Sequence, residues 1–225
     1  MHAFTDLALA AYCPRKLYYR RRDGTDPPER DERHALAFRY EELLDPATDL
    51  TAEPIAVPPT RYRIALGRSK ARIDAFEALA DPPVRDAFLE GRRARGIAHK
   101  VIEEPLAPSV VSAGVPPERG VWRPQTVRAV AAAKALAWER ETTVERAYVE
   151  YPTHGVVREV ELTARRTRLY RRAVRTAASL DGPPPRTRNR DKCTPCEHRG
   201  ECGVRTRSLR SLRSLRSLAG RSDAP

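Results

Sequence analysis

Four cysteines are the residues of this chain best suited to holding a metal. Cys193, Cys196 and Cys202 lie together in KCTPCEHRGEC near the C-terminus, and Cys13 lies in AYCPRKLYYRRR near the N-terminus. The first three have the spacing C-x2-C-x5-C, in which a tight turn lets the first two thiolates reach one centre. We expect no disulfides, because the N-terminal segment does not have the pattern of a secretory signal and cytoplasmic thiols stay reduced.

Three thiolates leave a tetrahedral centre one ligand short. His198 would complete a local zinc site of three cysteines and one histidine, with Cys13 a buried helix residue. Cys13 would instead complete an all-thiolate site, which draws the N-terminal helix against the C-terminal segment. Four thiolates suit either Zn²⁺ or an iron–sulfur cluster. The spacing alone leaves the fourth ligand and the metal open.

The charge of the chain favours a polyanionic partner. The formal net charge is +12, and only five of the 42 basic residues are lysines. The arginine fork suits phosphate oxygens, so we expect nucleic acid as the partner, with genomic base composition as the alternative explanation of the arginine excess. The expected contacts are the basic residues of AYCPRKLYYRRR, namely Arg15, Lys16, Arg20, Arg21 and Arg22. No window approaches about 18 continuous apolar residues, so we expect no membrane partner and a cytoplasmic protein.

These residues must be positioned by one α/β domain over residues 1–204. The N-terminal half predicts a helix over 5–22, a charged helix over about 29–45, an edge strand or loop over 54–66, where three prolines fall, and a strand or short helix over 67–80. The C-terminal half predicts two short strands within 94–114, an alanine-rich helix over 124–141, a hairpin of 144–151 and 155–163, and a helix over about 163–180.

That order of elements predicts a mixed sheet flanked by helices. The remaining residues, 205–225, form a basic low-complexity tail in which RSL repeats four times over 207–218. We expect this tail to be disordered, with a phosphate-binding arm as the alternative.

The segments AYCPRKLYYRRR, the alanine-rich helix from Gln125, GPPPRTRNRDKC and KCTPCEHRGEC together resemble a known family. It is the CRISPR-associated iron–sulfur nuclease family of RecB type, often called Cas-four, within the PD-(D/E)xK superfamily. The resemblance covers residues 1–25 and 120–203. It implies a restriction-endonuclease-type core closed by a cysteine cluster between the two ends of the chain. In the family four such cysteines ligate a 4Fe–4S cluster, which carries over to Cys13, Cys193, Cys196 and Cys202.

The resemblance also implies a role in antiviral defence, with DNA and CRISPR integration proteins as partners. Nucleases of this type hold Mg²⁺ or Mn²⁺ on an Asp and a Glu, with a Lys two residues after the Glu. None of the five lysines here has an acidic residue two positions earlier. The strand that aligns with this E-x-K motif has Val110 and Ser112 in the expected places. We therefore expect nuclease activity to be reduced or lost, and Mg²⁺ or Mn²⁺ to bind only if the site is active.

Other family positions are retained in part. His34 matches the histidine of the first motif, Asp74 the metal-binding aspartate, and Gln125 the glutamine of Q-x-x-x-Y, in which Ala129 replaces the tyrosine. Each also has a plain structural interpretation: His34 as a solvated residue of a charged helix, Asp74 as a surface residue, and Gln125 as a partner of backbone amides. Glu90-Gly-Arg92 is the nearest substitute for E-x-K, but a guanidinium does not replace an ammonium conservatively.

The sequence thus favours a DNA-binding, Cas-four-like protein with a 4Fe–4S cluster and a degenerate nuclease motif. One alternative is an active exonuclease that depends on divalent metal and uses carboxylates of the middle segment, which are Glu77, Asp86, Glu90, Glu103 and Glu104. The other alternative is a zinc-knuckle module that binds nucleic acid and has no nuclease ancestry.

Overall fold

A computed structural model of the chain describes residues 1–24 and 32–203. Within them a mixed sheet of six strands forms the centre of the fold. Its strands are β1 (His2–Ala3), β2 (Val84–Glu90), β3 (Ala94–Glu103), β4 (Leu106–Val111), β5 (Arg146–Tyr151) and β6 (Val156–Glu161). β2, β3 and β4 form an antiparallel meander, β5 lies parallel to β4, and β6 returns antiparallel to β5. The predicted α/β class with a mixed sheet is confirmed.

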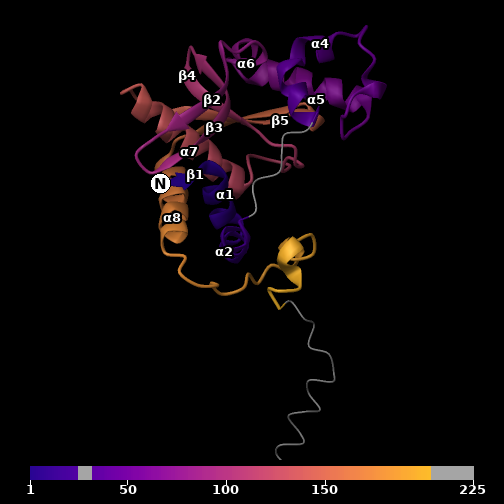
Figure 1. The fold of residues 1–225 in the computed structure, drawn as a ribbon. Helices are drawn as coiled ribbons and strands as arrows, with labels where there is room; N and C mark the ends of the chain where they lie inside the picture. Colours follow the sequence, from indigo (N-terminus) through magenta and orange to yellow (C-terminus); the bar gives the residue numbers. More distant parts are fainter. Residues whose placement is uncertain (25–31, 204–225) are drawn as a thin grey trace, which may run out of the picture.

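One face of the sheet is covered by α1 (Phe4–Tyr12), α7 (Arg123–Glu139) and α8 (Ala164–Ala178), as Figure 1 shows. α7 is the crossover between β4 and β5. Its alanines are fully buried from Ala129 to Ala133, and such small side chains let a helix approach a sheet closely. A Cβ at Gly91, in the β2–β3 turn, would lie only 2.7 Å from the Cα of Ala135 in α7. Glycine is required there because no side chain fits between turn and helix.

The opposite face carries a second hydrophobic core, built on shorter helices (Figure 1). These are α3 (Glu32–Ala35), η1 (Leu36–Phe38), α4 (Tyr40–Leu44), η2 (Leu50–Ala52), α5 (Pro59–Arg72) and α6 (Phe76–Ala80). Tyr40, Tyr62 and Phe76 bury their rings against Tyr148 of β5 and its neighbours. The sheet is therefore enclosed between two layers of helices.

A buried ion pair joins this second helical layer to the sheet. The Lys100 ammonium donates to the Glu150 carboxylate at 2.7 Å and to the Leu79 carbonyl at 2.6 Å, and it also donates to the Ala37 carbonyl. Ser109 donates to the second oxygen of Glu150. Burial lowers the pKa of Lys100, and Glu150 opposes that shift. Both charged side chains are 0% exposed, so each depends on the other for solvation.

Most of the predicted elements of the C-terminal half are confirmed. The two short strands are β3 and β4, the alanine-rich helix is α7, the hairpin is β5 with β6, and the last helix is α8. The edge strand or loop predicted over 54–66 is wrong, because α5 begins at Pro59 and runs to Arg72. Residues 67–80 contain the end of α5 and all of α6, with a turn over 73–75 between them. The helix predicted over 5–22 is divided at Cys13 into α1 and α2 (Pro14–Asp23).

Two predictions lie wholly or partly outside the described residues. These are the low-complexity tail over 205–225 and the first residues of the helix expected over 29–45. From residue 32 that second segment forms α3, η1 and α4 in place of one continuous helix. None of the helices in residues 1–24 and 32–203 has the length and apolar character needed to span a bilayer.

Candidate functional site

Cys13 lies at the junction of two helices, where its thiol is only partly covered. Pro14 disfavours helical geometry in the preceding residue, and Cys13 has the extended angles φ −155° and ψ 105°. α1 therefore ends at Tyr12, and Pro14 begins α2 as its first residue, where a missing N–H is tolerated. The Cys13 carbonyl accepts from the backbone N–H groups of Lys16 and Leu17. This break in the helix is what presents the thiol to the C-terminal segment.

The other three cysteines lie on consecutive tight turns after α8. η4 (Arg190–Lys192) is capped by the side chain of Asn189, which accepts from the Asp191 N–H at 3.0 Å. The backbone N–H of Cys196 then bonds the carbonyl of Cys193 at 3.3 Å. η5 (Glu197–Arg199) follows directly, and the Cys202 N–H bonds the His198 carbonyl at 2.8 Å. These turns fold the segment back on itself, so that its three thiols face one region.

All four cysteines line a single cavity between α2 and the C-terminal segment, which we call the cysteine cavity. It is defined by Cys13, Cys193, Cys196 and Cys202. Its free space for water is about 20 Å³, room for one or two molecules, so a larger group requires the thiols to turn outward. No three of the four sulfur atoms lie within 4.8 Å of one another. The structure thus brings the four predicted ligands to one cavity, but their sulfur atoms are too far apart to coordinate one metal ion as they stand.

The lining of the cysteine cavity is strongly cationic. It includes Arg15, Lys16, Arg186, Lys192 and Arg199, and it includes no carboxylate. Positive groups stabilise thiolates, which are the form of cysteine that binds metals. Burial raises the pKa of the Cys196 thiol, and the backbone N–H of His198 and the Lys16 ammonium act in the opposite direction. These cations offset part of the effect of burial, and the pKa of the Cys196 thiol remains above its usual value.

Polar contacts hold α2 and the C-terminal segment together around this cavity. The Arg15 guanidinium donates to the Pro184 carbonyl at 2.9 Å, and the Lys192 ammonium donates to the Tyr12 carbonyl at 2.9 Å. Lys16 forms an ion pair with Glu197 at 2.9 Å. Figure 1 shows the C-terminal segment, in yellow, beside α2. Few apolar side chains take part, so the contact is mainly ionic.

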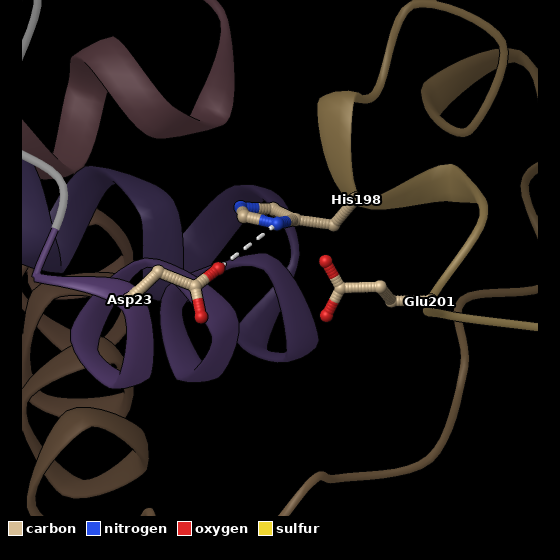
Figure 2. Close-up of side chains that lie close together, drawn as sticks. All are labelled: Asp23, His198 and Glu201. Atoms are coloured by element: carbon tan, nitrogen blue, oxygen red, sulfur yellow. Dashed lines mark ion pairs between the residues drawn. The ribbon is translucent and has the colours of Figure 1, made fainter.

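The His198 side chain contacts residues other than the thiols. Its ring stacks on Tyr19 with centroids 5.3 Å apart, and its Nδ1 lies 3.6 Å from an oxygen of Asp23. Figure 2 shows His198 and Glu201, from the C-terminal segment, meeting Asp23 at the end of α2. These three are the one group of such side chains, within the described residues, whose ligand atoms lie within 4.8 Å of one another. Arg22 already pairs with both carboxylates, so we interpret the group as an ion-pair network.

The five basic residues predicted to bind DNA all have partners within the chain. Lys16 and Arg15 hold the C-terminal segment as described above. Arg20 and Arg21 pair with Asp6 of α1, and Arg21 also donates to the Ala177 carbonyl of α8 at 2.7 Å. Arg22 bonds Asp23 and Glu201. These cations therefore join α2 to its surroundings, and a phosphate would have to compete for them.

Two of the predicted catalytic residues, Gln125 and His34, lie near the end of β4. Gln125, at the start of α7, has its amide nitrogen 3.5 Å from the Ser112 hydroxyl. His34 of α3 stacks on His99 of β3, with ring centroids 5.8 Å apart. The His99 Nδ1 accepts the backbone N–H of Val111 at 3.0 Å. His34, through His99, and Gln125, through Ser112, thus both lie near the end of β4, where Ser112 stands at the lysine position of the expected motif.

The carboxylates and the lysine expected of a nuclease site do not gather at the end of β4. Asp74 is exposed in the turn between α5 and α6, on the face of the sheet opposite α7. There it contributes to the raised pKa of Tyr148, which burial dominates. Successive residues of a strand face opposite sides, so Lys100 points away from His99 and is sealed with Glu150. Within residues 1–24 and 32–203, no group of three potential metal ligands is found here.

Sequence reasoning missed a second set of arginines, on α8. These five exposed arginines are Arg165, Arg168, Arg171, Arg172 and Arg175. The signal was present in ARRTRLYRRAVRTAA, because the apolar residues at helical spacing leave the arginines on the opposite side. We call this set the α8 arginine face.

Comparison with known proteins adds no family assignment. Neither a scan against protein-family models nor a search of curated proteins finds a match for this chain.

Proposed function

We propose that this is a DNA-binding protein of the Cas-four-like type, in which the four cysteines hold a 4Fe–4S cluster and the nuclease site is degenerate. In this proposal its partners are DNA and the integration proteins of CRISPR adaptation, as the resemblance implies. The observation that carries it is the cysteine cavity, to which Cys13 comes from one end of the chain and the other three thiols from the opposite end.

Two features favour Cys13 over His198 as the fourth ligand. Both residues line the cysteine cavity, but Cys13 offers a thiolate like the other three ligands and contributes to the raised pKa of Cys196. The His198 ring is engaged by Tyr19, Asp23 and Glu197, with each carboxylate 3.6 Å from a ring nitrogen. A ring committed to two carboxylates is a poorer ligand, because its nitrogens must turn away from both.

The separation of the thiols favours a cluster over a single zinc ion. At a Zn–S distance of about 2.3 Å, tetrahedral geometry places the four sulfur atoms about 3.8 Å apart. In the cysteine cavity no three sulfur atoms come within 4.8 Å. A cluster of four metals is wider than a single ion, so its ligands stand farther apart, and the thiols must turn outward from the present small cavity to admit it. When bound, the cluster would supply a covalent link between α2 and the C-terminal segment.

The loss of cutting activity is supported by the end of β4. The position expected for the metal-binding glutamate holds Val110, which is 1% exposed and packs in the core with α7. Ser112, two residues later, bonds Gln125 and offers no ammonium. Lys100, the buried lysine of β3, has no exposed side-chain surface, so a phosphate cannot reach it. Without two carboxylates and a lysine, metal-assisted hydrolysis lacks its usual groups.

Anaerobic purification of the full chain tests the cluster. We expect a brown protein with broad absorption near about 400 nm, and with iron and acid-labile sulfide in the ratio of a cubane cluster. Cys13→Ser should lose most of this absorption. His198→Asn is the matched control, because it removes the rival ligand and should leave the absorption intact. A colourless protein containing one zinc ion would overturn this part of the proposal.

Incubation with labelled DNA tests the remaining parts. We expect salt-dependent binding to DNA and no digestion of single- or double-stranded DNA with Mn²⁺ or Mg²⁺, even at high protein concentration. Asp86→Asn, which removes a carboxylate of β2 between the residues that pair with Lys100 and Ala98 of β3, serves as the comparison. Metal-dependent digestion by the wild type that this variant loses would establish an active exonuclease instead.

A further inference from the structure

α8 separates its apolar and basic residues onto two sides. Tyr170, Ala173, Val174 and Ala177 are buried against α1 and α7. At 100° per residue, the members of the α8 arginine face all fall within about a third of the helix circumference, opposite these four. The helix therefore presents a row of guanidinium groups to solvent while its apolar side belongs to the core.

These arginines differ from those of α2 in their ion pairing within the described residues. Among residues 1–24 and 32–203, no carboxylate forms an ion pair with any member of the α8 arginine face. Arg168, Arg171 and Arg175 follow one another at intervals of about 4.5 to 6 Å along the helix axis. A row of cations at this spacing is suited to successive phosphates of a nucleic-acid strand.

A groove continues this surface toward the cysteine cavity. Its basic lining consists of Arg172 of α8, Arg123 at the start of α7, and Lys192 of the C-terminal segment. No carboxylate lines it, and its volume is about 270 Å³. It shares Tyr12, Thr187 and Lys192 with the cysteine cavity. The C-terminal segment thus forms one wall of both sites.

We propose that the α8 arginine face and this groove together bind the phosphate backbone of DNA. The inference rests on the proposed DNA-binding function and assigns it to a surface other than α2. Phosphate contacts position a protein without reading sequence, so binding through this face is independent of sequence. An anionic membrane is a poorer occupant, because the apolar side of α8 is buried in the core and cannot enter a bilayer.

The test compares two triple variants of the full chain with equal change in charge. Arg168→Gln, Arg171→Gln and Arg175→Gln remove three members of the α8 arginine face. Arg61→Gln, Arg68→Gln and Arg72→Gln remove three exposed arginines of α5, which lies at the far end of the molecule from α8 in Figure 1. The dissociation constant for a labelled DNA of mixed sequence is measured from about 50 to 200 mM salt, with circular dichroism as the check on folding.

We expect the α8 triple variant to weaken DNA binding and to reduce the slope of log affinity against log salt by about 2 to 3, since each phosphate contact contributes about 0.9. The α5 triple variant should keep the wild-type slope.

Equal slopes for the two variants would overturn the inference and leave DNA binding itself in place. A wild type that does not bind DNA would overturn the proposed function and the inference together. Loss of binding to anionic vesicles, with an unchanged DNA slope, would assign α8 to a lipid surface and also overturn the inference.

Discussion

Two ion-pair systems connect distant parts of this chain, and they do so in opposite environments. Inside the fold, Lys100 and Glu150 are both 0% exposed and are surrounded by carbonyl and hydroxyl groups. At the surface, Lys16 and Glu197 are 23% and 58% exposed. The pair of Arg22 with Glu201 is 44% and 55% exposed.

The difference shows where the stability of each region comes from. A buried pair is costly to break, because removing one partner leaves the other charge without solvation. Exposed pairs are screened and contribute little each. The protein's own contacts therefore hold the helical layer over the sheet firmly and the C-terminal segment weakly. Under the proposed function, a cluster held by the four cysteines would supply most of what fixes that segment.

The largest effect is expected from breaking the buried pair. Lys100→Met leaves the Glu150 carboxylate buried without its cation and should lower the free energy of unfolding by about 3 to 5 kcal/mol, measured by urea denaturation. The double variant Lys100→Met with Glu150→Gln carries no buried charge and should recover much of this loss. A single variant as stable as the wild type would show that water reaches the site.

A smaller effect is expected at the neighbouring position of β3. His99→Ala removes the acceptor of the buried Val111 N–H and should lower the free energy of unfolding by about 1 to 3 kcal/mol. In His99→Asn the side-chain oxygen can stand where Nδ1 was, and part of the loss should be recovered. If alanine and asparagine are equally destabilising in urea, packing and not the hydrogen bond explains the cost.

Among the exposed ion pairs, one substitution should hardly change the free energy of unfolding of the whole protein. Lys16→Gln removes the pair with Glu197 and should weaken the docking of the C-terminal segment by about 0.2 to 1 kcal/mol. Faster hydrogen exchange at amides of residues 190–203 measures it. Lys70→Gln breaks another exposed pair, with Glu77, and should leave those amides unchanged. Global unfolding by Lys16→Gln would contradict the contrast drawn above.

The smallest expected effect depends on pH. The hydrogen bond from Arg22 lowers the pKa of Asp23 below its usual value of 3.8. The contribution of this carboxylate is therefore present above that value and is lost as the pH falls through the lower folded-state pKa. The protection factors of amides in residues 190–203, which correct hydrogen exchange for the pH dependence of the intrinsic rate, should fall in acid in the wild type. Asp23→Asn should remove that part of the acid dependence, and an identical acid profile in both proteins would exclude it.

Much of the C-terminal half could be predicted because its elements are strongly periodic. β3, β4, the β5–β6 hairpin, α7 and α8 each show a clear pattern. α5 was missed because Pro58 and Pro59 suggest a break, although proline is well tolerated in the first turn of a helix. Its buried Tyr62 and Leu66 do follow helical spacing. β2 was not predicted, because only Leu89 of its seven residues is buried and its polarity does not alternate.

The sequence by itself determined the four candidate thiols, the absence of an acidic residue two positions before any lysine, and the excess of arginine, since each depends only on residue type and spacing. The tertiary structure decided which arginines are available to a ligand. Arg20, Arg21 and Arg22 are engaged because Asp6 and Glu201 fold against them, whereas no described carboxylate reaches the α8 arginine face. The physical reason is that an ion pair depends on distance in space, and these partners are up to 179 positions apart along the chain.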